Sequence, residues 1–157
     1  MAISSTLLEV LIWVGLGVLA LVFFLAVLFG GTWMVLGRAA NQKEASARQR
    51  YPTALAIDGS ASFFGQESRG VIQMRGNGTL ILTDTELIFE RWVPNTTFRV
   101  PLKSIQGIER PTSFLGKTRF APLLKVVFSN EAMNPDSMAW QVRDLDGWVN
   151  RITAARR

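Results

Sequence analysis

The chain has 157 residues, with no cysteine and no histidine, and its 17 lysines and arginines outnumber 12 acidic residues to give a net charge of +5. Without cysteine it forms no disulfide or thiolate metal site. Without histidine it lacks the commonest general acid–base, the commonest metal ligand and the usual protein ligand of haem. We therefore expect no catalytic centre, no metal and no cofactor.

Residues 7–36 form an apolar run that contains a single charge, Glu9. About 20 apolar helical residues cross a bilayer core about 30 Å thick, so this run is long enough to span a membrane. Trp13 and Trp33 lie about 30 Å apart along such a helix, and tryptophan favours the level of the lipid headgroups. We expect both tryptophans, together with Arg38, to anchor the helix at the two membrane interfaces.

A buried core helix and a cleaved signal peptide are the alternatives to a membrane anchor. The apolar residues cover every face of the helix and exceed the roughly 18 residues typical of a span, which disfavours a core helix. A signal peptide has positive charges before an apolar segment of about 7–15 residues, whereas residues 1–6 contain no lysine or arginine. We predict an uncleaved transmembrane anchor over residues 1–37.

All lysines and arginines follow the apolar run, and positively charged flanks stay in the cytoplasm. We therefore expect a single-pass protein of the cell (inner) membrane with its N-terminus outside and residues 38–157 in the cytoplasm. Ala26, Gly30 and Gly37 share one helix face, and small residues permit close approach of another membrane helix. This face predicts packing against other integral membrane subunits.

Residues 38–53 are rich in alanine, glutamine, lysine and arginine, which favour helix. We expect a polar juxtamembrane helix or linker there, ended by the Tyr51-Pro52 pair. Residues 54–157 are long enough for one small domain with its own core. Basic residues in this part are not clustered with aromatic ones, so nucleic acid is not an expected partner.

Alternating apolar residues and turn residues predict antiparallel strands in the domain. Residues 54–66, interrupted by Gly59 and Gly65, indicate a loop or a short broken strand. Asn77-Gly78 favours a hairpin turn, because both residues tolerate positive φ. The predicted strands cover residues 71–74, 79–83, 86–92, 97–100, 105–110, 123–129 and 138–142.

A C-terminal helix should begin after Asp144, a good N-cap residue. Leu145, Trp148, Val149 and Ile152 would form its apolar face. The predicted fold of the domain is therefore α+β and mainly β, with about seven antiparallel strands in a bent sheet or barrel capped by this helix. The expected core residues are Leu82, Leu87, Phe89, Val126, Phe128 and Trp148.

The stretch Gly78–Glu90 (GTLILTDTELIFE) resembles the strand–turn–strand of bacterial GRAM and pleckstrin-homology-like (PH-like) domains, which share the rhythm G-x-L-x-L-T-x-x-x-L-x-F. Three further stretches fit in order, namely residues 100–105, 123–128 and 142–149. The resemblance covers residues 68–155 and implies a PH-like fold. That fold hosts lipid binders, peptide binders and scaffolds, so it implies an interaction module rather than an enzyme.

Five basic residues are expected at one edge of this domain, where they would bind a lipid headgroup or a protein partner, or form a solvated face. They are Lys103, Arg110, Lys117, Arg119 and Lys125. We predict a non-catalytic accessory or stabilising subunit whose domain binds the cytoplasmic face of a larger membrane protein complex. The alternative is a membrane-anchored sensor of anionic lipid headgroups, since the bilayer itself is an expected partner.

Overall fold

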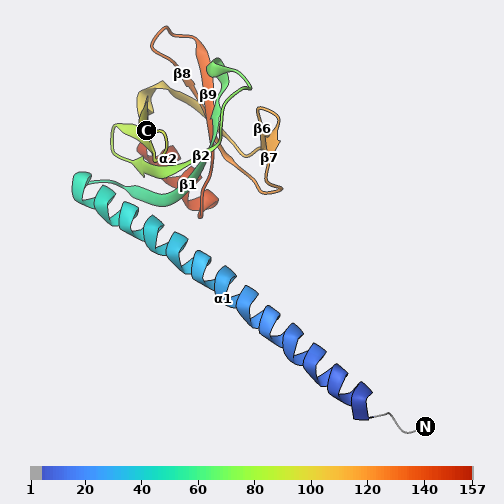
Figure 1. The fold of residues 1–157 in the computed structure, drawn as a ribbon. Helices are drawn as coiled ribbons and strands as arrows, with labels where there is room; N and C mark the ends of the chain where they lie inside the picture. The colour runs from blue at the N-terminus through green and yellow to red at the C-terminus, as the bar shows by residue number, and fades with distance from the viewer. Residues whose placement is uncertain (1–4, 157) are drawn as a thin grey trace. The chain divides into compact units, whose positions relative to one another are not determined.

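The computed structural model describes residues 5–156, and of residues 5–7, 11 and 30–36 it describes the backbone alone. The described chain forms one long helix, a seven-stranded antiparallel sheet, a separate short hairpin and a C-terminal helix (Figure 1). It divides into two compact units, one ending at Ala39 and the other, called the domain below, beginning at Ala40.

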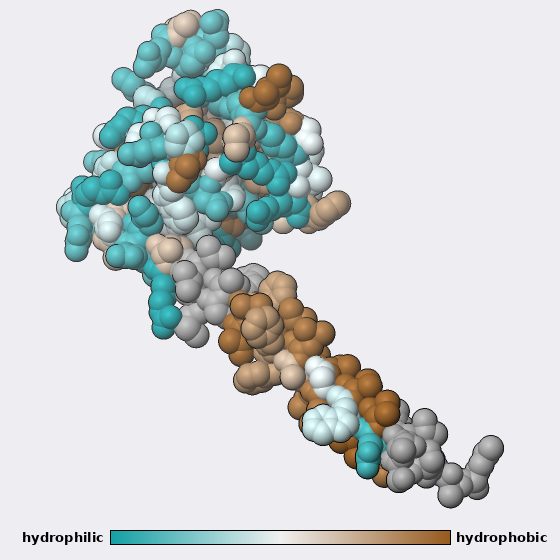
Figure 2. Space-filling model, viewed as in Figure 1, coloured by the Kyte–Doolittle hydropathy of each residue, from teal (hydrophilic) through white to brown (hydrophobic). Residues whose placement is uncertain are grey.

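Helix α1 covers Ser5–Arg50 without interruption. Its segment Leu8–Phe29 is long enough and apolar enough to cross a membrane, and the side chains described there are exposed and form a brown band in Figure 2. The helix ends directly before Tyr51-Pro52, as predicted, because proline disfavours the α conformation of the residue before it.

Residues 40–50 of α1 belong to the domain and pack on its sheet. Ala47 is fully buried in a cluster with Ile57, Ile81 and Ile88, which come from the first three strands. These strands are therefore covered on both faces. This double burial explains why they carry consecutive apolar residues rather than a strict alternation of apolar and polar ones.

The seven strands of the main sheet pair in the order β4-β3-β2-β1-β9-β8-β5, and all neighbours are antiparallel. Strands β4 and β5 form its two edges, so the sheet is not closed into a barrel. The prediction of a mainly β domain with seven antiparallel strands is thus confirmed, as an open sheet and not as a closed barrel. The strands are β1 Ala56–Gln66, β2 Gly76–Leu82, β3 Glu86–Arg91, β4 Thr96–Pro101, β5 Ile105–Glu109, β8 Leu124–Ser129 and β9 Pro135–Gln141.

Shorter elements complete the domain. Strands β6 (Ser113–Phe114) and β7 (Lys117–Thr118) form the separate hairpin, and two 3-10 turns, η1 (Glu67–Arg69) and η2 (Leu102–Ser104), follow β1 and β4. Helix α2 covers Leu145–Ala155. Its predicted cap is confirmed, because Asp144 Oδ1 accepts a hydrogen bond of 2.9 Å from the Gly147 amide.

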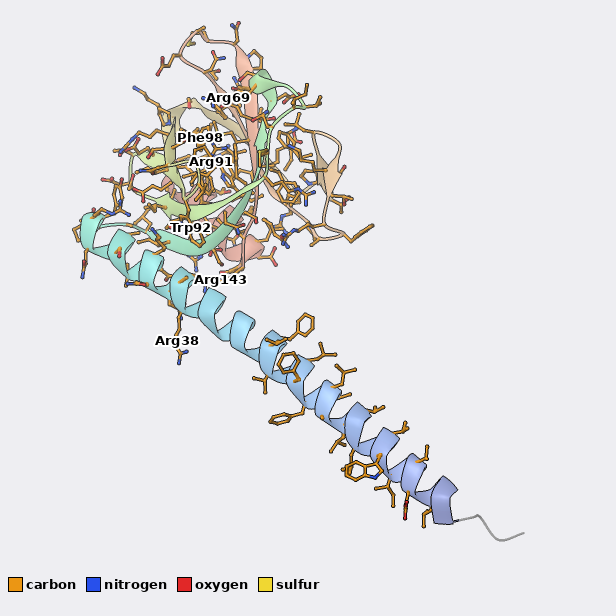
Figure 3. All side chains as sticks on the ribbon, viewed as in Figure 1. Arg38, Arg69, Arg91, Trp92, Phe98 and Arg143 are labelled. Carbon is orange, nitrogen blue, oxygen red and sulfur yellow. The ribbon has the colours of Figure 1, made fainter. Side chains whose placement is uncertain are left out.

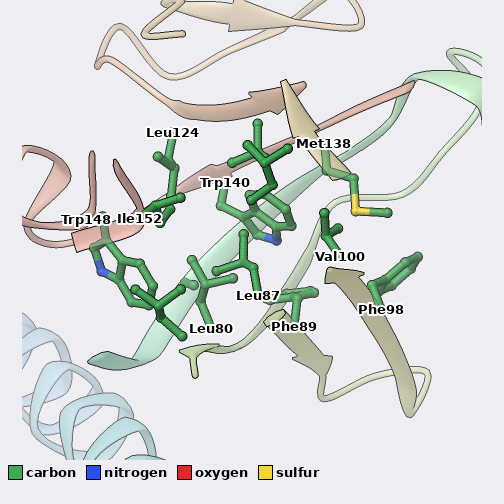
Figure 4. Packing of buried hydrophobic residues seen from close by; sticks show 14 of the residues in the cluster. Leu80, Leu87, Phe89, Phe98, Val100, Leu124, Met138, Trp140, Trp148 and Ile152 are labelled. Carbon is green, nitrogen blue, oxygen red and sulfur yellow. The ribbon is translucent and has the colours of Figure 1, made fainter. Parts of the chain in front are cut away.

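The main core lies between the inner face of the sheet and α2. Trp148 and Ile152 of the helix pack in one cluster with Leu80, Leu124 and Trp140 of the strands (Figure 4). The six predicted core residues are at most 5% exposed, so that prediction is confirmed.

Strand β1 is longer than its sequence indicates. Gly59 and Gly65 lie inside it, and both coincide with irregularities in strand pairing. A Cβ atom at Gly59 would lie 2.3 Å from the carbonyl oxygen of Ala40. This glycine therefore permits α1 to approach the sheet closely, and it does not break the strand.

Two predictions near the start of β2 are wrong. Residues 71–74 are not a strand, and Ile72 is 97% exposed. Asn77-Gly78 is not a hairpin turn, since both residues lie within β2. A Cβ atom at Gly78 would lie 2.4 Å from the ring of Phe89, so this glycine is required by packing across the strand pair.

Candidate interaction site

The five predicted basic residues come from η2, β7, β8 and the segments that follow β5 and β7. Arg110 pairs with Asp146 at 2.5 Å, and Lys125 pairs with Glu109 at 3.0 Å, so both charges are compensated. Lys103 lies in η2, before β5, whereas Arg110 follows the other end of that strand. Lys117 lies in β7 and Arg119 directly after it, and Arg119 donates to Gln141 Oε1 at 3.2 Å.

Lys117 joins the β6–β7 hairpin to the β1–β2 loop. Its Nζ donates to the carbonyl oxygens of Phe64 at 3.0 Å and Gln73 at 2.5 Å. Burial, followed by the positive charge of Arg75, lowers the pKa of Lys117. Arg75 connects the same two segments. It donates to the carbonyl oxygen of Thr118 at 2.9 Å, and its guanidinium lies 4.4 Å from the Phe64 ring centroid.

The β3–β4 loop adjoins the same region. The amide of Trp92 donates to the Asn77 carbonyl at the start of β2. Arg69 of η1 and Arg91 at the end of β3 lie 5.1 and 5.7 Å from the ring centroid of Phe98 (Figure 3). Residues 67–75 therefore adjoin both residues 91–95 and residues 117–120, and we call these three segments together the loop end.

The loop end exposes large apolar side chains that sequence reasoning did not select. Ile72 is 97% exposed and Phe120 is 95% exposed. Figure 2 shows brown and tan side chains that protrude from the mostly teal surface of the domain. The remaining exposed apolar residues of the loop end are Val71, Met74 and Val93. For residues 71–74 the apolar signal was present in the sequence, but it indicated a strand.

The loop end is also strongly basic. Its five cations, Arg69, Arg75, Arg91, Lys117 and Arg119, stand against one carboxylate, Glu67. Among the described residues, none of the five forms an ion pair, and their contacts are with carbonyls, amides, hydroxyls and rings. By contrast, seven cations elsewhere in the domain pair with carboxylates: Arg48, Arg50, Arg99, Arg110, Lys125, Arg143 and Arg151.

Asp136 of β9 accepts hydrogen bonds from Gln66 and Ser68, at the point where the loop end begins. Its carboxylate is 2% exposed and accepts hydrogen bonds from Gln66 Nε2 at 2.5 Å and from the amide and hydroxyl of Ser68 at 3.0 and 2.7 Å. Burial alone would raise the pKa of Asp136. The hydrogen bonds from Gln66, Ser68 and Ser137 outweigh burial, and the pKa lies below its ordinary value of 3.8.

We expect Asp136→Asn to lower the free energy of unfolding by about 1–3 kcal/mol at pH 7, since it disturbs several buried hydrogen bonds. Because the folded pKa is depressed, the carboxylate stabilises the wild type above about pH 4, and this contribution disappears as pH falls through the folded pKa. Chemical unfolding of both proteins at pH 7, 5 and 3 should therefore show a difference that shrinks with acidification. A difference that stays constant would contradict the prediction.

A groove of about 1100 Å³ lies between the free edges of the sheet, β4 and β5. Phe98, Phe128 and Met138 line it from the core side. Arg99, which pairs with Glu86, lies on its β4 side. Grooves of this size accommodate small ligands or extended peptides.

Charged contacts fasten residues 40–50 of α1 to the sheet. Arg143, labelled in Figure 3, pairs with Glu44 of the helix at 2.6 Å and with Asp58 of β1 at 3.0 Å. Burial lowers the pKa of Arg143, but its hydrogen bond to Glu44 and the charge of Asp58 raise it further, so the guanidinium stays charged. Arg50 adds a second bridge, to Glu90 of β3 at 2.6 Å.

The predicted membrane-helix residues are placed as follows. Ala26 and Gly37 are exposed, and a Cβ built at Gly37 would meet no atom of another described element within 4 Å. Trp13 is 73% exposed, and Arg38 is exposed as well (Figure 3). The predictions for Gly30 and Trp33 concern side chains outside the described residues. Among the described residues, no group of acidic, histidine or cysteine side chains is arranged to hold a metal ion.

Comparison with known proteins shows a likeness of fold. No family model matches the chain, and no curated protein matches it. The C-terminal domain of an unknown protein from Leishmania infantum is similar, with a TM-score of 0.52, 14% identity, and coverage of 72% of this chain and 96% of that domain. A chain of the 8S snRNP assembly intermediate has a TM-score of 0.47 and 9% identity, covering 66% of this chain and 79% of its own.

Proposed function

We propose that the chain is a single-pass membrane protein whose domain is a non-catalytic interaction module, serving as an accessory or stabilising subunit of a larger membrane complex. One observation carries this proposal. The candidate span Leu8–Phe29 and the sheet-packed residues 40–50 belong to the same uninterrupted helix. A domain built around the end of its own anchor suits a role in binding neighbouring membrane proteins.

The topology of the domain supports a PH-like fold within this proposal. The seven strands are antiparallel, the order runs from β4 to β1 and then from β9 to β5, and a single C-terminal helix packs on the inner face. A seven-stranded bent sheet with a C-terminal helix is what the sequence resemblance implies. A PH-like domain would bring a protein- or lipid-binding surface to the membrane, and it would need no catalytic residues.

The proposed orientation places the domain in the cytoplasm, because Arg38, Lys43, Arg48 and Arg50 follow the apolar segment closely and basic flanks stay inside. Protease added to intact cells should therefore leave the domain uncut. Digestion of the domain by the added protease would mean that it lies outside the cell and that the proposed orientation is wrong.

The accessory-subunit role can be tested with the full chain, purified from its host membrane in a mild detergent. We expect defined protein partners in stoichiometric amounts. Ala26→Leu should reduce their recovery about tenfold or more, because a larger side chain on the small-residue face prevents close helix approach.

The matched control is Ala20→Leu, which makes the same chemical change within the candidate span. Residue 20 lies six positions from residue 26, or about one and two-thirds helical turns away, and so on a different face. This control should keep its partners. Recovery of the chain alone, without any stoichiometric protein, would contradict the accessory-subunit role. Equal losses in both variants would contradict the assigned face.

A further inference from the structure

We propose that the loop end is a second membrane contact, which inserts apolar side chains into an anionic bilayer surface. This inference rests on the proposed membrane anchoring, since the anchor keeps the bilayer within reach of the domain. It concerns residues other than the small-residue face of α1, and it needs no headgroup pocket.

The apolar side chains of the loop end have no role inside the domain. Ile72 and Phe120 are almost fully exposed, and Met74 and Val93 are 85% and 80% exposed. Exposed apolar groups of this number in one region mark an interaction surface. They project from three separate loops rather than from one flat face, which suits insertion between lipid headgroups.

The charges of the loop end complement an anionic bilayer surface. Its five cations stand against one carboxylate, which gives a local charge of +4, and among the described residues they contact carbonyls, amides, hydroxyls and rings rather than carboxylates. Long cationic side chains around apolar tips are typical of an interfacial membrane surface, where each cation is attracted to anionic lipid.

Hydrogen bonds within the loop end connect its apolar segments. Lys117 donates to the carbonyl oxygen of Gln73, which lies between Ile72 and Met74. Arg75 donates to the carbonyl oxygen of Thr118, which lies two residues before Phe120. The β1–β2 loop and the hairpin, which carry the apolar tips, are thus fixed to each other.

The absence of natural cysteine permits a direct test in the full chain. Ile72→Cys and Phe120→Cys are each labelled with the environment-sensitive dye NBD and reconstituted into vesicles of phosphatidylcholine, with or without about one-third phosphatidylglycerol. Quenching is measured with spin-labelled lipid. Asp84→Cys is the matched exposed control, because it lies beyond the other end of β2, about 23 Å along that seven-residue strand.

We expect strong quenching, several-fold above that at residue 84, for the dyes at residues 72 and 120 in vesicles that contain phosphatidylglycerol. Raising the salt from about 0.1 to 1 M shortens the Debye length from about 10 to 3 Å and should withdraw both dyes from the lipid. Dyes that stay in water in both kinds of vesicle would overturn the inference. So would quenching that is equal with and without anionic lipid.

A label at Phe23→Cys, in the middle of the candidate span, separates the two proposals. If this dye is quenched while those at residues 72 and 120 are not, the anchor holds and the second contact fails. If the dye at residue 23 also remains in water, the anchoring itself fails and the inference fails with it.

Discussion

Trp148→Ala should lower the free energy of unfolding by about 3–5 kcal/mol, the usual cost of removing a large aromatic side chain from a core. Trp148 is 2% exposed and belongs to the cluster that joins α2 to the inner face of the sheet. Small domains have a total stability of only about 5–15 kcal/mol, so this loss would be a large share of the stability of the domain. Chemical unfolding of the full chain in a non-ionic detergent, followed by the circular dichroism of the sheet, measures this change.

Asn150→Ala is the control for this prediction, because residue 150 lies on the exposed side of the same helix. Surface substitutions of this kind change stability by about 0.5 kcal/mol or less. A loss below about 1 kcal/mol for Trp148→Ala would mean that α2 does not pack on the sheet.

Gly59→Ala should destabilise the domain by about 3 kcal/mol, at the upper end of the usual range for overpacking. The added Cβ would lie 2.3 Å from the carbonyl oxygen of Ala40 and 2.9 Å from Cβ of Glu44. The nearest obstacle is main chain, which cannot rotate away as a flexible side chain would. Residues 40–50 would have to move off β1, which would also strain the bridges that Arg143 makes.

Gly107→Ala is the matched control, since among the described residues no atom beyond its own chain neighbours lies within 4 Å of a Cβ at that position of β5. We expect it to be neutral or slightly stabilising, because alanine restricts the unfolded chain. Hydrogen exchange of the amides of residues 40–50 should accelerate in Gly59→Ala and stay unchanged in Gly107→Ala. Equal stability of the two variants would mean that this part of α1 is not packed on the sheet.

Sequence reasoning succeeded where local pattern and burial agree. Strands β2, β3 and β8 contain the predicted inward-facing residues, and α2 has both its cap and its apolar face. Each of these elements buries at least one face in the main core, so its periodicity is visible in the sequence. The end of α1 was equally predictable, because proline acts locally.

The errors arose at glycines and at residues whose environment is set by distant parts of the chain. Gly59 and Gly78 were interpreted as signals of a backbone turn or break. Both positions instead require glycine because another element passes so close that a Cβ atom would not fit. Ile57, Ile81 and Ile88 are buried by residues 40–50 of α1, which no pattern within the strands reveals. Residues 71–74 have the composition of a strand but find no partner strand.

The pairing of charges at the candidate site also depends on residues that are distant in the sequence. Whether Lys125 is available to a ligand depends on its pairing with Glu109, and this pairing follows from the register of β5 on β8. Arg110 is likewise neutralised by Asp146 of α2, far along the chain. Counting basic residues therefore predicted the sign of the surface but not which charges remain unpaired.

The position of β1 in the sheet has a consequence for the order in which the chain folds. β1 pairs with β2 on one side and with β9 on the other, where Gln66 lies opposite Met138. At about 5–20 residues per second, a ribosome needs about 4–14 s to synthesise the residues between them. Until then β1 has a bare edge that can template aggregation. The domain therefore completes its sheet only when synthesis is nearly finished, and chains that stop before β9 cannot complete it.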